Sequence, residues 1–579
     1  MITSKEGISS CIPPLKDADG QWVLDPKGKA DLFAKSFAEK FVLPDASVNE
    51  YTDIRANGGD VMSGFLPVRR RHAESVLKGL RLDSATGPDA LGAKVLARFH
   101  KEFAQPLCII ARQILNTGCW PKPWKDHWVF PLYKKRCKAT PGNYRGIHLS
   151  AQFSKACERL LGRLWTPYLQ SSGALGRRQF AYKKATGYRD ALAFNVNSWL
   201  WALAHNRRVA LHCADVSGAF DKVEQRRLLS KLQTSGIHPK LLQVISSWLD
   251  GRDAYVIVDG VQSRPMKLSN MVYQGTVWGP VLWSVFYEDV GRPVDKTGYT
   301  ESVYADDLNC WRVYPVSVGD EVIRCSLRTC QAEIHKWGAA NSITFDNSKE
   351  SQHILHHRDG RGDNFKILGL LFDPRLSMFH AATGIVRETS FRLRRVLRLR
   401  GHFCTNELMM YYKSEVLGYI EGFTAGIYHA SPYVLQMVDD VQSSFLASLD
   451  MSEEVAFKRY RLAPLCTRRD IAMLGLLHRV VLRSAPEPLR SLFPLARSTL
   501  FEHGFGRGPC HTKQLADPIM PGHSACFKRS LFGLVAVYNQ LPSDAVACNT
   551  VKAFQAALQR LLESKLGMND WRNYFKRTC

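Results

Sequence analysis

The segment Glu301-Ser-Val-Tyr-Ala-Asp-Asp-Leu-Asn-Cys-Trp311 places two adjacent acids between two runs of strand-forming residues. Its valine, tyrosine, leucine and tryptophan side chains favour β-structure, so the segment predicts a β-hairpin with Asp306 and Asp307 at its tip. Two neighbouring carboxylates repel each other unless a cation compensates them, and hard divalent ions prefer oxygen ligands. The segment therefore predicts a site for Mg²⁺ or Mn²⁺, with surface acids in a turn as the alternative.

A third acid ends a separate apolar run upstream, Val209-Ala-Leu-His-Cys-Ala-Asp215, which has the composition of a buried strand. Together with Asp306 and Asp307, this acid offers three carboxylates for metal ions. Such a set suits two ions that bind the attacking and leaving oxygens of a phosphoryl transfer. The combination favours an enzyme of phosphoryl or nucleotidyl transfer.

The charge balance indicates a polyanionic partner. Of the 579 residues, 78 are Lys or Arg and 53 are Asp or Glu, which gives a net charge of +25. A protein with this excess is expected to bind nucleic acid in a salt-dependent way. The hydrophobic fraction of 45% is ordinary for a folded protein. The length predicts about three or four structural units.

Cysteine usage and hydropathy argue against a secreted or membrane protein. The 15 cysteines include no Cys-x-x-Cys pair, so reduced thiols in an intracellular protein are expected. No run approaches the roughly 18 apolar residues of a membrane span, and the N-terminus lacks an apolar signal core. Zinc binding by short His/Cys pairs stays open, although their order matches no standard finger; the four candidate ligands are Cys510, His511, His523 and Cys526.

Two further blocks carry candidate nucleotide-binding residues. Phe220 stands five residues after Asp215, where a rigid ring could lie beneath a nucleotide sugar and exclude a 2′-hydroxyl; ordinary core packing is the alternative. Asp221 could pair with a nearby base and orient the turn. In Tyr273-Gln-Gly-Thr276, Gln274 can hydrogen-bond a base or sugar, and Gly275 permits a close approach of backbone to a ligand.

The periodicity predicts secondary structure around these blocks. One helix is expected over residues 29–41, with Leu32, Phe33, Phe37 and Phe41 on one face, and two helices flank a turn at residues 85–90. Strands are expected over residues 128–133, 209–215, 301–304 and 365–372, and a helix begins at Gly279-Pro280. Beyond residue 380 the chain is expected to be predominantly helical.

In combination, these blocks resemble the reverse transcriptase of non-LTR, LINE-type retrotransposons. The resemblance runs from about residue 20 to the C-terminus. It rests on Pro131-Leu-Tyr-Lys-Lys135, Gly142-Asn-Tyr-Arg-Gly-Ile-His-Leu-Ser150, Arg178-Gln-Phe-Ala-Tyr182, the Asp215 block, Tyr273-Gln-Gly-Thr276, Tyr304-Ala-Asp-Asp307 and Phe365-Lys-Ile-Leu-Gly369. It implies an RNA-directed DNA polymerase that uses an RNA template, a DNA primer, deoxynucleoside triphosphates and two Mg²⁺ or Mn²⁺ ions.

The resemblance also implies residue roles. Asp215, Asp306 and Asp307 would be catalytic, and Lys349 would protonate the pyrophosphate leaving group. The metal site would comprise Asp215, Val216, Asp306 and Asp307. Arg145 would grip the triphosphate, since a guanidinium binds phosphate oxygens in a fork, assisted by one of Lys134, Lys135 or Lys138. Phe220 would be the sugar gate, and Gln274 and Gly275 would line the nucleotide. The residues that would contact the nucleic acid are Tyr304, Lys366, Leu368, Gly369, Arg394, Arg395 and Arg398.

Residues 386–400 supply the expected nucleic-acid helix. Leu393, Val396, Leu397 and Arg400 fall on one side, and Arg387, Arg394, Arg395 and Arg398 concentrate positive charge around it. A cationic helix can follow the phosphates of a duplex without reading its bases, although a merely solvated face is the alternative.

The implied fold is an α+β right-hand polymerase with fingers, a palm built on a small antiparallel sheet, and a helical thumb. The expected divisions are a connector over residues 1–60, fingers 61–205, palm 206–375, thumb 376–450 and a helical C-terminal domain 451–579, with the reverse transcriptase domain over about 115–375.

Such elements usually carry an endonuclease before the polymerase. We expect none here, so a missing domain or another protein would have to supply it. The expected location is intracellular and nuclear. Two alternatives stay open, namely a catalytically silent RNA- or DNA-binding remnant of a retroelement and an intron-encoded maturase.

Overall fold

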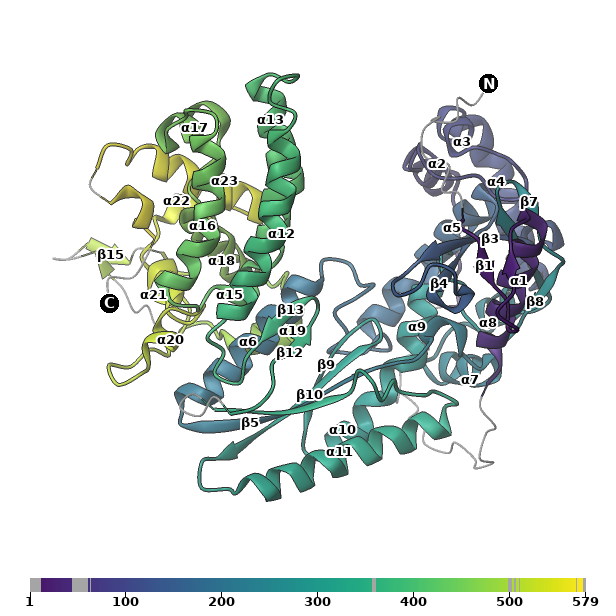
Figure 1. The fold of residues 1–579 in the computed structure, drawn as a ribbon, viewed down its shortest axis with the longest axis horizontal. Helices are drawn as coiled ribbons and strands as arrows, with labels where there is room; N and C mark the ends of the chain where they lie inside the picture. Colours follow the sequence, from purple (N-terminus) through teal and green to yellow (C-terminus); the bar gives the residue numbers. More distant parts are fainter. Residues whose placement is uncertain are drawn as a thin grey trace. The chain divides into compact units, whose positions relative to one another are not determined.

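The computed structural model has two compact units that interleave along the chain and combine helices with small sheets (Figure 1). Unit 1 comprises residues 1–182, 215–293 and 332–346, and unit 2 comprises residues 183–214, 294–331 and 347–579. The structure describes residues 12–43, 61–62, 64–356, 361–497, 502–503, 507–509, 511–568 and 570–575. The predicted mixture of helices and small sheets is confirmed.

Unit 1 contains a five-stranded sheet in the order β4-β3-β6-β7, with β8 also paired to β6. The strands are β3 (His127–Tyr133), β4 (Tyr144–Leu149), β6 (Arg252–Val258), β7 (Val261–Gln262) and β8 (Met266–Leu268). β3 and β4 are antiparallel and pair Leu132 with Arg145, whereas β3 and β6 are parallel. The sheet is therefore mixed.

The N-terminal helix α1 (Pro26–Ala38) packs on this sheet and continues into the 3₁₀ turn η1 (Glu39–Phe41). The Asp25 carboxylate accepts from Gly28 N at 2.6 Å and caps the helix. Phe33 and Phe37 are buried, and the Phe33 ring meets Tyr144 of β4 edge-on at 4.9 Å. The predicted helix is confirmed, although Leu32 is only half-buried.

The rest of unit 1 is largely helical. Helices flank residues 85–90 as predicted, although the chain breaks at Phe99 and so forms two helices after that turn. The three helices are α2 (Arg70–Lys78), α3 (Ala93–Arg98) and α4 (His100–Thr117). They are followed by α5 (Gln152–Ser171), α7 (Gln225–Thr234), α8 (Pro239–Leu249) and α9 (Gly279–Tyr287). α9 begins at Gly279-Pro280 as predicted.

Unit 2 contains a four-stranded sheet in the order β11-β5-β10-β9. Its strands are β11 (Ser351–Leu355), β5 (Arg207–Asp215), β10 (Asp307–Pro315) and β9 (Thr300–Tyr304). β9 and β10 form a hairpin, as predicted (Figure 1). Because Asp307 already pairs with Tyr304, the turn consists of Ala305 and Asp306, and Ala305 has a φ of 60°. The division between the units falls at the end of β5, after Ala214.

Residues 365–372 form a tight hairpin, so the expectation of one continuous strand is wrong. Strand β12 (Phe365–Ile367) turns back as β13 (Leu370–Phe372). The two residues between them, Leu368 and Gly369, have φ values of 50° and 87°. Positive φ at both central residues is the geometry that closes a two-residue hairpin loop.

The rest of unit 2 is predominantly helical, as predicted. Helix α12 (Phe379–Leu397) packs beside α16 (Pro432–Ala447) (Figure 1). Other helices of unit 2 are α6 (Tyr188–Ala204), α13 (Thr405–Tyr411), α17 (Glu453–Tyr460), α18 (Leu465–Val481) and α23 (Val551–Glu563). One short strand pair, β14 (Glu502–His503) and β15 (Arg507–Pro509), interrupts them. Within the described ranges, we find no helix long and apolar enough to span a membrane.

Candidate active site

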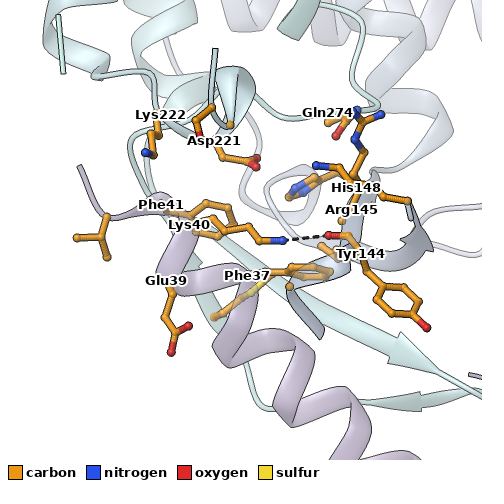
Figure 2. A pocket seen from close by; sticks show the side chains of 18 residues that line it. Phe37, Glu39, Lys40, Phe41, Tyr144, Arg145, His148, Asp221, Lys222 and Gln274 are labelled. Carbon is orange, nitrogen blue, oxygen red and sulfur yellow. Dashed lines mark hydrogen bonds between the residues drawn. The ribbon is translucent and has the colours of Figure 1, made fainter. Parts of the chain in front are cut away.

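A cavity of about 330 Å³ opens in unit 1 between the N-terminal helix, the β3–β4 hairpin and the loop that follows β5. Figure 2 shows Lys40, Arg145, Asp221, Lys222 and Gln274 around it. These residues come from segments far apart in the sequence. The cavity therefore gathers several of the blocks that the sequence singles out.

The β3–β4 hairpin supplies two cations to the cavity. Arg145 is the second residue of β4, and Lys134 follows β3, where its main-chain N–H donates to Asn143 O at 3.0 Å. Both side chains line the cavity. Lys138, in contrast, lies 5.4 Å from the centre of the Tyr133 ring and is not among the lining residues. Of the three candidate lysines, Lys134, Lys135 and Lys138, only Lys134 thus lines the cavity.

Asp221 is the acid that faces these cations, since the carboxylate of Glu39, the other acid that lines the cavity, points away from them (Figure 2). Asp221 ends the 3₁₀ turn η4 (Ala219–Asp221) that follows β5. Burial raises the pKa of Asp221, and the positive charges of Lys40, Lys134, Arg145 and Lys222 oppose that rise, in this order. Four cations around one carboxylate leave a positive field in the cavity, which suits a polyanionic ligand such as a triphosphate.

Sequence reasoning treated Asp221 only as a residue that orients a turn, and it missed Lys40 altogether. The one signal for Asp221 was its place six residues after Asp215. Lys40 had none, since it lies at the end of an ordinary amphipathic helix.

The predicted residues Gln274 and Gly275 pack against strand β4. Gln274 lines the cavity, and its main-chain oxygen accepts from His148 N at 2.9 Å. Gly275 has a φ of 112°, and a Cβ there would overlap the carbonyl oxygen of His148. The close approach that this glycine permits is thus to the protein's own backbone. Gly275 also lines a second cavity, of about 510 Å³, together with Arg81, Lys155 and Arg159.

A buried polar network lies directly behind this turn. The imidazoles of His127 and His148 share a hydrogen bond of 3.1 Å between their Nδ1 atoms, and Arg252 donates to His127 Nε2 at 2.5 Å. Burial is the main cause that lowers the pKa of His148 to about 3, and the Arg252 charge adds to it. Both imidazoles are therefore neutral near pH 7, and the network holds β4 and β6 together.

Glu158 of α5 fixes the other end of the turn. Its Oε2 accepts from Val277 N at 2.7 Å, and its Oε1 accepts from Trp248 Nε1 at 3.2 Å. The Trp278 indole donates to the main-chain oxygen of Glu158 at 2.7 Å. The turn at residues 273–278 is consequently held by buried hydrogen bonds, which rigidify a site when all partners are satisfied.

Phe220 packs among aromatic rings. Its ring stacks on Trp283 with centroids 6.0 Å apart and meets Tyr182 edge-on at 6.2 Å. The residue is half-buried and does not line the cavity. Both interpretations, a sugar gate and a packing residue, fit this position.

The predicted metal ligands lie at strand ends. Asp215 ends β5, Val216 forms a bridge with Phe345, and Asp307 begins β10 beside the turn that holds Asp306. Burial raises the pKa of Cys213 to about 12, and the negative charge of Asp307 adds to the rise. Asp307 thus lies near Cys213, which stands two residues before the end of β5.

The predicted donor set consists of three carboxylates and the main-chain carbonyl oxygen of Val216, and such oxygen ligands fit Mg²⁺ or Mn²⁺. Among the described residues, however, no group of three His, Cys, Asp or Glu side chains is close enough together to hold an ion. Lys349 lies exposed in the turn before β11. The metal ligands and the proton donor therefore stay predictions.

The predicted nucleic-acid residues of unit 2 lie on two surfaces. Lys366 is exposed on β12, beside the Leu368-Gly369 turn. On α12, Leu393 and Val396 are buried, and the exposed cations are Arg387, Arg394, Arg395 and the C-cap residue Arg398. Arg400, expected on the apolar side, is exposed because α12 ends at Leu397. Tyr304 is half-buried at the end of β9.

Two of the four possible zinc ligands form hydrogen bonds within the protein. His511 Nε2 hydrogen-bonds the main-chain oxygen of Tyr538 at 3.0 Å, and His523 Nδ1 accepts from Met520 N at 3.1 Å. Burial raises the pKa of Cys526 to about 11, so its thiol is protonated near pH 7. Cys510 lies outside the described residues.

Residues 133–372 match the family described as reverse transcriptase (RNA-dependent DNA polymerase). The chain is 27% identical over 404 residues to the RNA-directed DNA polymerase from mobile element jockey of Drosophila melanogaster, covering 65% of this chain and 43% of that protein. The jockey protein of Drosophila funebris is 25% identical over 405 residues, with 66% and 43% covered. The probable RNA-directed DNA polymerase from transposon BS of Drosophila melanogaster is 25% identical over 305 residues, with 51% and 34% covered.

The matched regions thus span less than half the length of these relatives. They confirm the predicted resemblance to reverse transcriptases over residues 133–372.

Proposed function

We propose that this chain is an RNA-directed DNA polymerase of a non-LTR retroelement. In the reaction, the 3′-hydroxyl of a DNA primer attacks the α-phosphate of a deoxynucleoside triphosphate, and pyrophosphate leaves. The observation that carries the proposal is the cationic cavity, because it joins Arg145, Lys134 and Gln274 from three separate blocks within the matched region. Positioning and electrostatic stabilisation supply most of the catalysis in phosphoryl transfer.

Arg145 and Lys134 would bind the triphosphate, and Gln274 would contact the incoming nucleotide. A guanidinium forms paired hydrogen bonds with phosphate oxygens, and lysine acts as a point charge. The buried network of His127, His148 and Arg252 would keep Arg145 and Gln274 in fixed relative positions, because it fixes the strand and the turn that carry them. Phe220 would exclude a 2′-hydroxyl from the sugar position.

We assign the binding of two Mg²⁺ or Mn²⁺ ions to Asp215, Val216, Asp306 and Asp307. When bound, such ions neutralise charge on the phosphates and lower the pKa of the attacking hydroxyl. Lys349 would give a proton to the pyrophosphate. The support is the oxygen-only donor set at strand ends and the sequence match that includes all of these residues.

The same proposal includes the fingers, palm and thumb arrangement of a right-hand polymerase. An RNA template and DNA primer would run along the exposed arginines of α12, with the β12–β13 hairpin near the primer end. A partner protein or a further domain would provide the endonuclease, and a nuclear location would give access to target DNA. The direct test is extension of an oligo(dT) primer on poly(rA) by the full chain, with and without Mg²⁺.

A further inference from the structure

The N-terminal segment forms one wall of the nucleotide cavity and is more than a connector. Phe37 and Lys40 line the cavity together with Arg145 and Lys134 of the opposite wall. Figure 2 shows the Lys40 ammonium pointing inward from η1 toward strand β4. It donates to the Tyr144 carbonyl at 3.0 Å and lies 4.9 Å from the centre of the Phe37 ring.

Lys40 is electrostatically coupled to the acid in the cavity. Among the charges that act on Asp221, that of Lys40 has the largest effect on its pKa. Burial lowers the pKa of Lys40, Asp221 opposes this, and Lys134 adds to it. Two lysines that repel each other in one cavity suit an anion with more than one charge.

The donors of Lys40 exceed what the protein uses. An ammonium has three N–H donors, and the Tyr144 carbonyl takes one of them. A lysine that only fixed the helix would gain little from partial burial beside Lys134, whose charge opposes its own. A triphosphate between the two walls would give both lysines a shared partner.

We propose that Lys40 binds the triphosphate of the incoming nucleotide from the wall opposite Arg145 and Lys134, so that residues 26–41 are part of the nucleotide site. Before the nucleotide arrives, the charge of Asp221 partly compensates the charges of these cations. This inference rests on the proposed polymerase function, because it assigns a ligand to the same cavity.

Primer extension tests the inference when it is measured as a function of nucleotide concentration. Lys40→Met keeps the aliphatic stem and removes the charge. We expect the KM for dTTP and the inhibition constant of inorganic pyrophosphate to rise by a similar factor, about ten-fold, which is the loss of one hydrogen bond between charged groups. The Kd for the primer–template should stay unchanged, and Lys40→Arg should restore most of the loss. Lys35→Met, which replaces an exposed lysine on the adjoining helix α1, is the control.

Unchanged KM and pyrophosphate inhibition in Lys40→Met, with a lower melting temperature, would show that Lys40 only clamps the helix and would overturn the inference. Equilibrium binding of Mg²⁺–dTTP to the full chain distinguishes failure of the Lys40 inference from failure of the polymerase assignment. Weaker binding in Lys40→Met than in Lys35→Met supports the inference even without primer extension. Equal binding in the two variants, or no binding by the unsubstituted protein, contradicts it.

Discussion

Gly275 lies so close to the main chain of His148 that a Cβ at position 275 would overlap the His148 carbonyl oxygen. The neighbouring hydrogen bond from His148 N to Gln274 O, at 2.9 Å, ties the turn to strand β4. Because β4 also carries Arg145, two candidate nucleotide ligands are held by one rigid contact. This contact depends on a glycine, since its φ of 112° is rarely accessible to other residues.

Gly275→Ala is therefore expected to destabilise unit 1 by about 2 kcal/mol or more, from backbone strain and the steric overlap together. Urea denaturation followed by tryptophan fluorescence measures the loss. Gly64→Ala is the control, because a Cβ at that exposed position would meet nothing within 4 Å. Equal midpoints for the two variants would contradict this role of Gly275.

The histidine pair behind the turn predicts a loss of stability in acid. The unfolded chain binds a proton at each histidine near pH 6.5, whereas burial in the folded state lowers the pKa of His148 to about 3 and also lowers that of His127. Stability is therefore full above pH 6.5 and falls as the pH drops toward 3, by about 1.4 kcal/mol per pH unit for each histidine. Unfolding free energies at pH 7.0 and 5.5 should show a shallower fall in His148→Gln. An equal fall in the unsubstituted protein and in His148→Gln would argue against a contribution of His148 to the loss of stability in acid.

Substitution of Phe220 tests the sugar gate. If its ring excludes the 2′-hydroxyl, Phe220→Ala should increase kcat/KM for a ribonucleotide relative to the matching deoxynucleotide by about ten-fold or more. Both values of kcat/KM are measured on one preparation. Partial unfolding caused by the lost Trp283 contact therefore lowers both equally and cancels in their ratio. An unchanged ratio would leave Phe220 as a packing residue.

The arginines of α12 should control the salt dependence of duplex binding. Replacing Arg394, Arg395 and Arg398 with glutamine removes three exposed charges, and the slope of log Kd against log salt should decrease by about two to three. Arg392 is the control, because it pairs with Glu388 at 2.9 Å and lies 4.4 Å from the centre of the Tyr419 ring. An equal slope in the triple variant and the unsubstituted protein would place the duplex elsewhere.

The local sequence was sufficient for elements that depend on neighbouring residues. The β9–β10 hairpin follows from strand-forming residues on both sides of a short turn, and α1 follows from the periodicity of Phe33 and Phe37. The turn at Leu368-Gly369 was not predictable in the same way, because a leucine rarely adopts the positive φ that the turn requires.

The site was predictable where a block has a distinctive composition, as with Arg145 and Gln274, and not where it depends on long-range packing. Lys40 meets Tyr144 across more than one hundred residues, and neither position signals the other. The network of His127, His148 and Arg252 is equally invisible, because isolated histidines in strands have no characteristic spacing.

The most direct test of the polymerase assignment compares the unsubstituted chain with Asp306→Asn on poly(rA) primed with oligo(dT). Asp259→Asn makes the same change in another hairpin turn, between β6 and β7, and serves as the control. The unsubstituted chain and Asp259→Asn are expected to extend the primer only when Mg²⁺ or Mn²⁺ is present, and Asp306→Asn is expected to bind the template–primer without extending it. Extension by Asp306→Asn at the rate of the unsubstituted chain, or no extension by the unsubstituted chain, would contradict the account.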